Sequence, residues 1–270
     1  MNLSLRLGTR GSPLALAQAK WVAERLGGAE LVPIRTSGDA DGGPGDKSRW
    51  VDTIETALVR GEIDLAVHSA KDVPGDLAEG TEIVAVPPRE DARDLLIGEV
   101  GPGARVGTAS LRRAAQLTAW REDLRVVDLR GNVDTRLRKW RDGEVEALVL
   151  ARAGLLRLGR DEPGTLLEAP VFVPAAGQGA LALQARAGDR RAASVGDEDA
   201  LTCLMAERAA VRVLGASCQT PVGIHADGRR MRGFVGAPDG SAWVLDEVEG
   251  LDGENLARRM LAAGARELLG

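Results

Sequence analysis

Residues 107–117 read GTASLRRAAQL, and we interpret this stretch as the end of a strand that runs directly into a helix. This interpretation places Arg112 and Arg113 in the first helical turn. A helix N-terminus carries partial positive charge and unpaired N–H groups, so each cation there is disfavoured by roughly 0.3–1 kcal/mol. The sequence therefore indicates that an anionic group compensates these two arginines.

Two further segments, GTRGSPLAL (8–16) and LRGNVDTRLRK (129–139), show the same strand-to-helix pattern. Ser, Asn and Asp are favoured N-cap residues, and proline is favoured at the first helical position. The residues concerned are Arg10 and Ser12, which precede a proline, and Arg130 and Arg136, with Asn132 or Asp134 as the cap. Three junctions therefore combine free backbone N–H groups, a small polar side chain and arginines.

In open α/β sheets, strand-to-helix junctions lie along the carboxyl edge of the sheet, where ligands bind. Guanidinium groups form bidentate bonds to carboxylates and phosphates, and five arginines at three junctions indicate several anionic groups. The chain contains no P-loop motif, and PAAGQGALAL (174–183) offers only a G-x-G. We therefore expect a polycarboxylate ligand. The alternative is that each arginine is a solvated surface residue paired with a nearby Asp or Glu.

The composition restricts the class of protein. With 270 residues, 44% of them hydrophobic and 28% charged, the chain is long enough for two or three domains of an ordinary globular protein. A net charge of −5 argues against binding to nucleic acid. Two cysteines and two histidines predict no metal site. The start lacks a signal-peptide pattern and no segment is apolar enough to span a membrane, so we expect a cytoplasmic protein.

Short apolar runs alternate with helical patterns from residue 3 to about residue 157, which predicts an α/β fold of βαβ units with mostly parallel sheets. Proline-rich and glycine-rich segments at 86–94 and 169–179 indicate that the chain leaves one α/β lobe and returns to it. From about residue 199 we expect a small α+β domain. The predicted domains are 1–87 with 178–198, then 91–173, then 199–270.

The stretch DLAVHSAKDVP (64–74) carries the clearest candidate for a catalytic group. It ends a strand in Lys71 and Asp72, and a carboxylate beside a fixed cation suits acid–base or electrostatic catalysis. The alternative is an ordinary salt bridge in a loop. We expect His68 to be a core histidine bonded to backbone. Cys203 has the setting of a small buried hydrophobe, whereas Cys218 lies in the polar loop GASCQTPVG, where a thiol can be reactive.

Eight ordered motifs resemble those of the porphobilinogen deaminase (hydroxymethylbilane synthase) family. They are TRGSPLALAQ, TSGD, AVHSAKDVP, GTASLRR, LRGNVDTRL, AGLLRLG, PAAGQGAL and GASCQTPVG, and they extend from about residue 5 to 225. The segment after TSGD is shorter than that of the family, and only Lys47 and Trp50 can be matched to it.

The resemblance implies a transferase of tetrapyrrole (haem) biosynthesis that joins four porphobilinogen units head to tail, releasing ammonia and then hydroxymethylbilane. It implies growth on a dipyrromethane cofactor attached through a thioether to Cys218. It also implies a monomer with two periplasmic-binding-protein-like lobes, a hinge and a cleft, and a small third domain. Each pyrrole carries an acetate and a propionate, which fits the polycarboxylate expected from the arginines.

The resemblance further implies a role for each matched residue. Asp72 resembles the catalytic carboxylate that stabilises cationic intermediates. Resemblance to cofactor-binding residues extends to Lys71, Asp72, Ser69, Thr108, Ser110, Arg112 and Arg113. Resemblance to substrate-binding residues extends to Arg10, Ser12, Gln18, Arg130, Arg136, Arg157 and Gln178. A fixed carboxylate near an electron-poor cation is also the physical requirement of such a reaction.

A second hypothesis is a two-lobed binding protein that captures a small polycarboxylate and performs no chemistry. Composition and the placement of the arginines fit it equally well. The lack of a secretory pattern and the settings of Asp72 and Cys218 disfavour it. A DNA-binding regulator is disfavoured because no helix-turn-helix segment is present and the chain is acidic.

Overall fold

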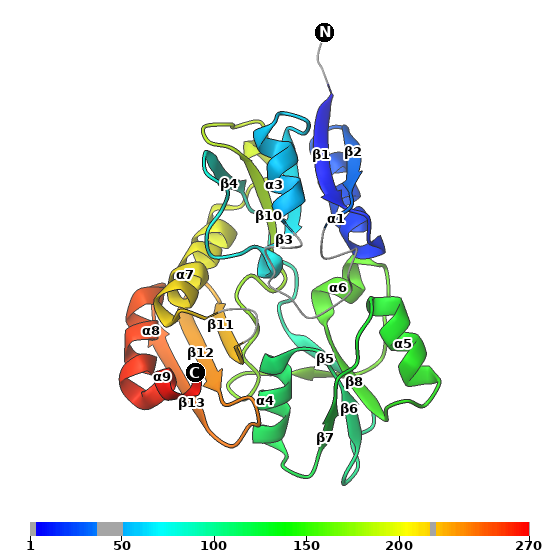
Figure 1. Cartoon of the computed structure of the whole chain (residues 1–270), viewed down its shortest axis with the longest axis vertical. Coiled ribbons are helices and arrows are strands. Elements are labelled where there is room, and N and C mark those ends of the chain that lie inside the picture. Colours follow the sequence, from blue (N-terminus) through cyan, green and yellow to red (C-terminus); the bar gives the residue numbers. More distant parts are fainter. Residues whose placement is uncertain (1–3, 37–50, 217–219, 270) are drawn as a thin grey trace. The chain divides into compact units, whose positions relative to one another are not determined.

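A computed structural model describes residues 4–36, 51–216 and 220–269. The chain divides into two compact units, which we call the first unit (1–90 with 179–204) and the second unit (91–178 with 205–270). Figure 1 shows their elements along the chain. The bounds that we predicted for three domains stay a prediction.

The first unit contains one sheet with a helix on each face. Its strands are β1 (Leu5–Arg10), β2 (Ala29–Ile34), β3 (Leu65–Ser69), β4 (Thr81–Ala85) and β10 (Leu181–Arg186). Its helices are α1 (Pro13–Arg25), α3 (Asp52–Val59), the short η2 (Ala70–Asp72) and η3 (Ala193–Val195), and the first part of α7 (Glu198–Leu214).

The strands of this sheet lie in the order β2-β1-β3-β10-β4. β1 pairs in parallel with β2 and β3, whereas β10 is antiparallel to both β3 and β4. Leu7, Leu65 and Leu183 face α1 in one fully buried cluster, and Ala66 packs with Ile54 of α3 on the opposite face.

The second unit begins with an α/β sheet of the same design. Its strands are β5 (Asp94–Gly98), β6 (Arg105–Gly107), β7 (Arg125–Val127), β8 (Ala147–Ala151) and β9 (Thr165–Leu167), and its helices are α4 (Leu111–Trp120), α5 (Val133–Arg141) and α6 (Arg152–Arg157). The strand order is β7-β6-β8-β5-β9, and β5 is antiparallel to β8 and β9. Leu117 of α4 packs on one face of the sheet, and Leu137 of α5 packs on the other.

The remaining part of the second unit is a small antiparallel sheet with helices. It consists of β11 (Val222–Ala226), β12 (Arg230–Gly236), β13 (Trp243–Glu249), α8 (Gly253–Met260), η4 (Leu261–Ala265) and α9 (Arg266–Leu269). Phe234 of β12 joins Ala115 of α4 and Val173 in one buried cluster, so the small sheet packs against α4.

The predicted fold class, two α/β lobes and a small α+β region, is confirmed. The prediction of mostly parallel sheets needs a correction, because half of the strand pairings in each five-stranded sheet are antiparallel. The antiparallel strand is the first strand after each crossing: β5 follows residue 91, and β10 follows residue 179. In the described part of the chain, no helix is long and apolar enough to cross a membrane.

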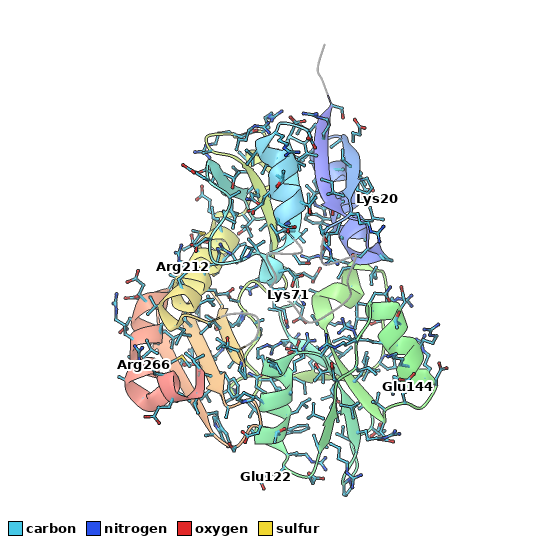
Figure 2. All side chains as sticks on the ribbon, in the orientation of Figure 1. Lys20, Lys71, Glu122, Glu144, Arg212 and Arg266 are labelled. Carbon is cyan, nitrogen blue, oxygen red and sulfur yellow. The ribbon has the colours of Figure 1, made fainter. Side chains whose placement is uncertain are left out.

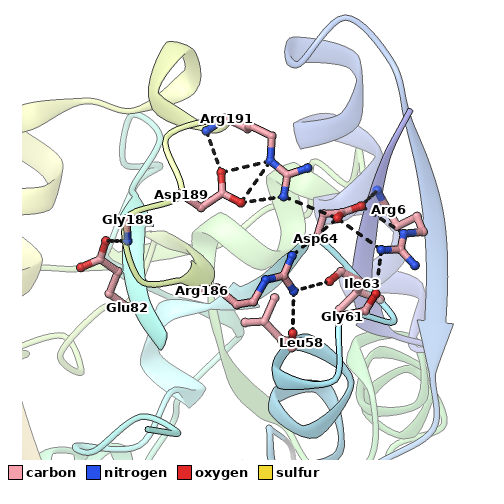
Figure 3. Close-up of polar contacts among 10 residues, drawn as sticks. All are labelled: Arg6, Leu58, Gly61, Ile63, Asp64, Glu82, Arg186, Gly188, Asp189 and Arg191. Atoms are coloured by element: carbon pink, nitrogen blue, oxygen red, sulfur yellow. Dashed lines mark hydrogen bonds and ion pairs between the residues drawn. The ribbon is translucent and has the colours of Figure 1, made fainter. Parts of the chain in front are cut away.

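Asp64, at the amino end of the first sheet, anchors three strands (Figure 3). Its carboxylate accepts from the backbone N–H of Arg6 at 3.0 Å and from the Arg6 Nε at 3.1 Å. Arg191 Nη2 lies 3.4 Å and Arg186 Nη2 3.7 Å from its Oδ1. Burial alone would raise the pKa of Asp64, but the hydrogen bonds from Arg6 and the charge of Arg191 outweigh it and hold that pKa below its ordinary value.

We expect Asp64→Ala to lower the free energy of unfolding by about 1–2 kcal/mol near neutral pH, because it removes charge-assisted hydrogen bonds at the start of β3. Since the folded-state pKa of Asp64 is lowered, its contribution is present above the ordinary value of 3.8 and is lost as pH falls through the folded-state pKa. Urea unfolding of the wild type and the variant, at neutral and at acid pH, measures the difference between their free energies of unfolding. A difference that is as large in acid as at neutral pH contradicts this account.

Candidate functional site

In the first unit, the predicted residues meet where β1 and β3 end at the carboxyl edge of the sheet. A pocket at this edge contains the side of α1, the start of α3 and the ends of both strands. Its lining includes Arg10, Ser12, Gln18, His68, Ser69 and Asp72. All of the predicted residues of this unit except Lys71 therefore share one pocket, and Lys71 precedes Asp72 in η2 (Figure 2).

Local hydrogen bonds fix the α1 side of this pocket. Ser12 caps α1 as predicted, because its side chain accepts from Ala15 N at 3.3 Å and Pro13 occupies the first helical position. Gln18 is buried and exchanges hydrogen bonds with Ser69 Oγ at 2.9 and 3.1 Å. This contact ties α1 to the end of β3, so Ser69 and the following Asp72 are held against the helix.

His68 differs from its prediction in one respect. It is buried, with 5% of its surface exposed, but its partner is the side chain of Gln184 and not backbone. It also lines the pocket that contains Asp72. Burial lowers the pKa of His68 to about 4, although the bond to Gln184 and the charge of Asp72 act in the opposite direction. The imidazole is therefore neutral at physiological pH.

In the second unit, the question raised by residues 107–117 has a structural answer. Ser110 caps α4 and accepts from Arg113 N at 3.4 Å. The side chains of Arg112 and Arg113 are only 4% and 7% exposed, and both contact the buried carboxylate of Asp94, at 2.9 and 2.8 Å. The two arginines at this helix N-terminus are therefore neither solvated nor compensated in full, since one carboxylate faces two guanidinium groups.

We call this group, with Gln116 and Gln178, the Asp94 cluster. Arg112 donates to Gln116 Oε1, to Val173 O, to Asp94 and to Gln178 Oε1 at 2.9–3.3 Å. Its Nε is buried and has no hydrogen-bond partner among the described residues. Burial alone would raise the pKa of Asp94, but the two guanidinium charges hold it well below its ordinary value. The cluster therefore carries one excess positive charge and one unsatisfied donor.

Both crossing segments of the chain end in the Asp94 cluster. Asp94 begins β5, shortly after the first crossing, and Gln178 is the last residue before the second. Gln178 Nε2 donates to Ala92 O at 2.6 Å and to Asp94 Oδ1 at 2.7 Å. Gly223 of β11 also approaches here, because a Cβ at this position would lie 2.5 Å from Val173 O and 3.2 Å from Arg112 Cδ.

The other predicted residues of the second unit lie at nearby strand and helix ends. Thr108 is buried after β6, and its Oγ1 accepts from Ser110 N at 3.2 Å. Asn132, one of the two predicted caps, caps α5. Arg130 is exposed and pairs with Asp128 at 2.8 Å, and Arg136 donates to Gly131 O at 2.7 Å. Arg157 ends α6. Arg130 therefore fits the alternative that was considered for each arginine, a solvated surface residue paired with a nearby carboxylate.

The remaining candidates concern sulfur and metal. Cys203 is buried in α7, as expected. Cys218 lies outside the described residues, as do Lys47 and Trp50. Within residues 4–36, 51–216 and 220–269, no group of three or more His, Cys, Asp or Glu side chains could hold a metal ion.

Sequence reasoning missed Asp94, which pairs with Arg112 and Arg113 in the second unit, and Gln184, which bonds His68 in the first. Asp94 is the last charge of the run REDARD (89–94) and stands directly before the apolar run LLI. A charged residue at the start of a buried strand is a weak signal, because nothing local shows which cations it will meet. Gln184, a polar residue inside the apolar run ALALQA, was a signal that could have been used.

Asp94→Ala is expected to lower the free energy of unfolding by about 3–5 kcal/mol, because it leaves two buried guanidinium groups without a carboxylate. Asp128→Ala removes a carboxylate from an exposed Arg–Asp pair and is the matched control, with an expected loss below about 1 kcal/mol. Urea unfolding of the three proteins checks both values. Equal losses in the two variants would show that the Asp94 cluster contributes no more than a surface ion pair.

Comparison with known proteins places these residues in a family. The family model described as "Porphobilinogen deaminase, dipyromethane cofactor binding domain" matches residues 5–194, and "Porphobilinogen deaminase, C-terminal domain" matches 201–267. The chain belongs to the porphobilinogen deaminase family. The porphobilinogen deaminase of Rubrobacter xylanophilus is 46% identical over 98% of this chain and 96% of its own length, and that of Roseiflexus castenholzii is 43% identical over 100% and 99%.

The resemblance inferred from the eight motifs is thereby confirmed, and so are an enzyme family and a region that binds a dipyrromethane cofactor. Among solved structures, a periplasmic binding protein of Salmonella typhimurium with high arginine specificity matches with a TM-score of 0.40 and 13% identity, over 71% of this chain and 91% of that one. A TM-score of this size adds nothing to the sequence comparison.

Proposed function

We propose that this chain joins four porphobilinogen units head to tail, with loss of one ammonia for each unit, and releases hydroxymethylbilane for tetrapyrrole synthesis. The observation that carries the proposal is the charge imbalance of the Asp94 cluster, where two buried guanidinium groups share one carboxylate. A buried excess charge is costly unless an anion neutralises it. A ligand that carries acetate and propionate groups supplies such anions.

The residues present fit a dipyrromethane cofactor, and we propose that a thioether to Cys218 attaches it. The unsatisfied Nε of Arg112 is the kind of donor that a ligand carboxylate would complete. Gly223 of β11 comes close to the Arg112 side chain, because a Cβ there would lie 3.2 Å from Arg112 Cδ. When bound, the cofactor supplies the pyrrole carbon to which the first unit is joined.

The polar groups at the junctions are proposed to bind carboxylates and pyrrole nitrogens. For the cofactor we propose Lys71, Asp72, Ser69, Thr108, Ser110, Arg112 and Arg113. For the incoming substrate and the growing chain we propose Arg10, Ser12, Gln18, Arg130, Arg136, Arg157 and Gln178. Apart from Arg157, which ends α6, the hydroxyl and guanidinium donors lie at strand ends and helix N-termini, where backbone N–H groups add to the positive potential.

Asp72 is proposed to be the catalytic carboxylate. Departure of ammonia from porphobilinogen breaks a C–N bond, the electron pair leaves with nitrogen, and the pyrrole carries the positive charge. Asp72 stands in a short helical turn after β3, in a pocket whose other walls are held by the Gln18–Ser69 contact. A carboxylate held in this way stabilises the cation without reorganisation of solvent.

We further propose that the enzyme acts as a monomer in the cytoplasm on small-molecule substrates, without nucleic acid. The net charge of −5 supports the proposal that the protein does not bind nucleic acid.

Intact-mass measurement tests the attachment. The purified chain, or the chain after incubation with porphobilinogen, is expected to exceed its sequence mass by one dipyrrole unit, and peptide mapping should place the excess on Cys218. Cys218→Ser should lack the adduct, whereas Cys203→Ser, a change of the buried cysteine, should retain it. A wild-type chain that acquires no adduct would favour a binding protein without chemistry.

Asp72→Asn tests the catalytic assignment. The side chain is half-buried on a surface turn, so we expect stability to change by less than about 0.5 kcal/mol. We expect kcat to fall by at least about a hundredfold, because the change removes the charge that stabilises the cation. Thermal unfolding and steady-state turnover measure the two effects. Near-normal turnover in this variant would reject the assignment.

A further inference from the structure

A chain of hydrogen bonds in the first unit, part-buried at Glu55 and Thr81 and buried at His68, ends at the pocket of Asp72. It starts at Glu55 of α3, whose Oε1 accepts from Ala78 N at 3.1 Å and from Gln184 Nε2 at 2.7 Å. Gln184 Nε2 also donates to Thr81 Oγ1 at 2.8 Å, and Gln184 Oε1 lies 3.1 Å from His68 Nε2. Gln184 is fully buried, so its amide cannot turn toward water.

This chain fixes the orientation of the amide and thereby the tautomer of the imidazole. If the Gln184 amide were reversed, its oxygen would face the Glu55 carboxylate, and two acceptors at 2.7 Å repel each other. The Gln184 oxygen therefore faces His68, and His68 Nε2 must carry the proton that it donates. In a neutral imidazole that is protonated at Nε2, Nδ1 carries a lone pair. Nδ1 can therefore accept a hydrogen bond but cannot donate one.

His68 Nδ1 has no hydrogen bond to any of the described residues, although His68 lines the pocket with Asp72 and Ser69. Asp72 is near enough for its charge to act on the imidazole. Besides the guanidinium of Arg10, the pocket therefore contains a carboxylate and a neutral acceptor side by side. This pair suits a group that carries positive charge and several N–H donors.

We propose that His68 binds the ammonium group of the substrate beside Asp72. The Nδ1 atom of His68 accepts a hydrogen bond from one ammonium N–H. This inference rests on the proposed function, because the substrate of that reaction is an aminomethyl pyrrole. It assigns the leaving group to His68 and Asp72, in a pocket that Arg10 also lines, whereas the guanidinium groups bind the carboxylates. Gln184 and Glu55 act through His68 as positioning residues.

A weak acceptor is what the departure of ammonia requires. The buried imidazole is too weak a base to remove a proton from an alkylammonium, so the leaving group keeps all three protons while the hydrogen bond holds it. The C–N bond then breaks with both electrons on nitrogen, neutral ammonia departs, and the positive charge passes to the pyrrole. An uncharged imidazole does not oppose that charge, whereas an imidazolium would.

Two substitutions separate the nitrogens of His68. His68→Gln keeps a donor near the position of Nε2 and loses the Nδ1 acceptor, while His68→Asn keeps an acceptor near the position of Nδ1 and loses the contact with Gln184. With cofactor-loaded enzyme, the kcat/KM for porphobilinogen is compared with the inhibition constant of the same pyrrole carrying methyl in place of aminomethyl. The methyl analogue tests the rest of the pocket without the ammonium group.

We expect His68→Gln to lower kcat/KM about tenfold to a hundredfold, the effect of one hydrogen bond to a charged group, and to change inhibition by the methyl analogue less than about twofold. His68→Asn should keep more of kcat/KM than His68→Gln. The inference is overturned if His68→Gln keeps wild-type kcat/KM, or if binding of the methyl analogue weakens in parallel. Wild-type enzyme that does not turn over porphobilinogen would instead reject the proposed function itself.

Discussion

A single buried carboxylate shared by two guanidinium groups is the interaction on which the second unit depends. Asp94 binds Arg112 and Arg113 from the first turn of α4, and Gln178 binds Asp94 from the returning segment. Taking these charges out of water is costly, and close pairing with several hydrogen bonds offsets the cost only in part. The remaining positive charge is the basis of the proposal that the cluster binds ligand carboxylates.

The sheets explain why functional groups gather where they do. In both units three parallel strands are followed in space by one antiparallel strand that arrives from a crossing segment. The parallel strands direct their carboxyl ends to one edge, and helices begin there with Ser12, Ser110 and Asn132 as caps. The opposite edge of the first sheet is used differently, since Asp64 binds arginines from β1 and β10 and fixes strand ends (Figure 3). In the first sheet, the pocket residues and the ion pairs of Asp64 thus lie at opposite ends of the strands.

The local features of these junctions could be predicted from sequence, because caps and helix starts depend on neighbouring residues. Ser12 with Pro13, and Ser110 before Arg112, were recognisable for that reason. The direction of β5 and β10 was not, since an apolar run such as LALQAR carries no information on which strand will pair with it. The hydrogen-bond partners of His68 and Arg112 could not be predicted either. Gln184 is 116 positions from His68, and Asp94 is 18 positions from Arg112, so only the fold brings each pair together.

The central claim is that the two buried guanidinium groups that share Asp94 bind the carboxylates of an oligopyrrole. The most direct measurement is uptake of the dipyrrole mass from porphobilinogen by apo-protein, followed by intact-mass analysis of wild type, Arg113→Gln and Arg121→Gln. Arg121 pairs with Asp123 on the surface and serves as the control. The account predicts uptake by wild type and Arg121→Gln and strongly reduced uptake by an Arg113→Gln protein that still shows a cooperative unfolding transition. Uptake by Arg113→Gln at the wild-type rate and extent would contradict it.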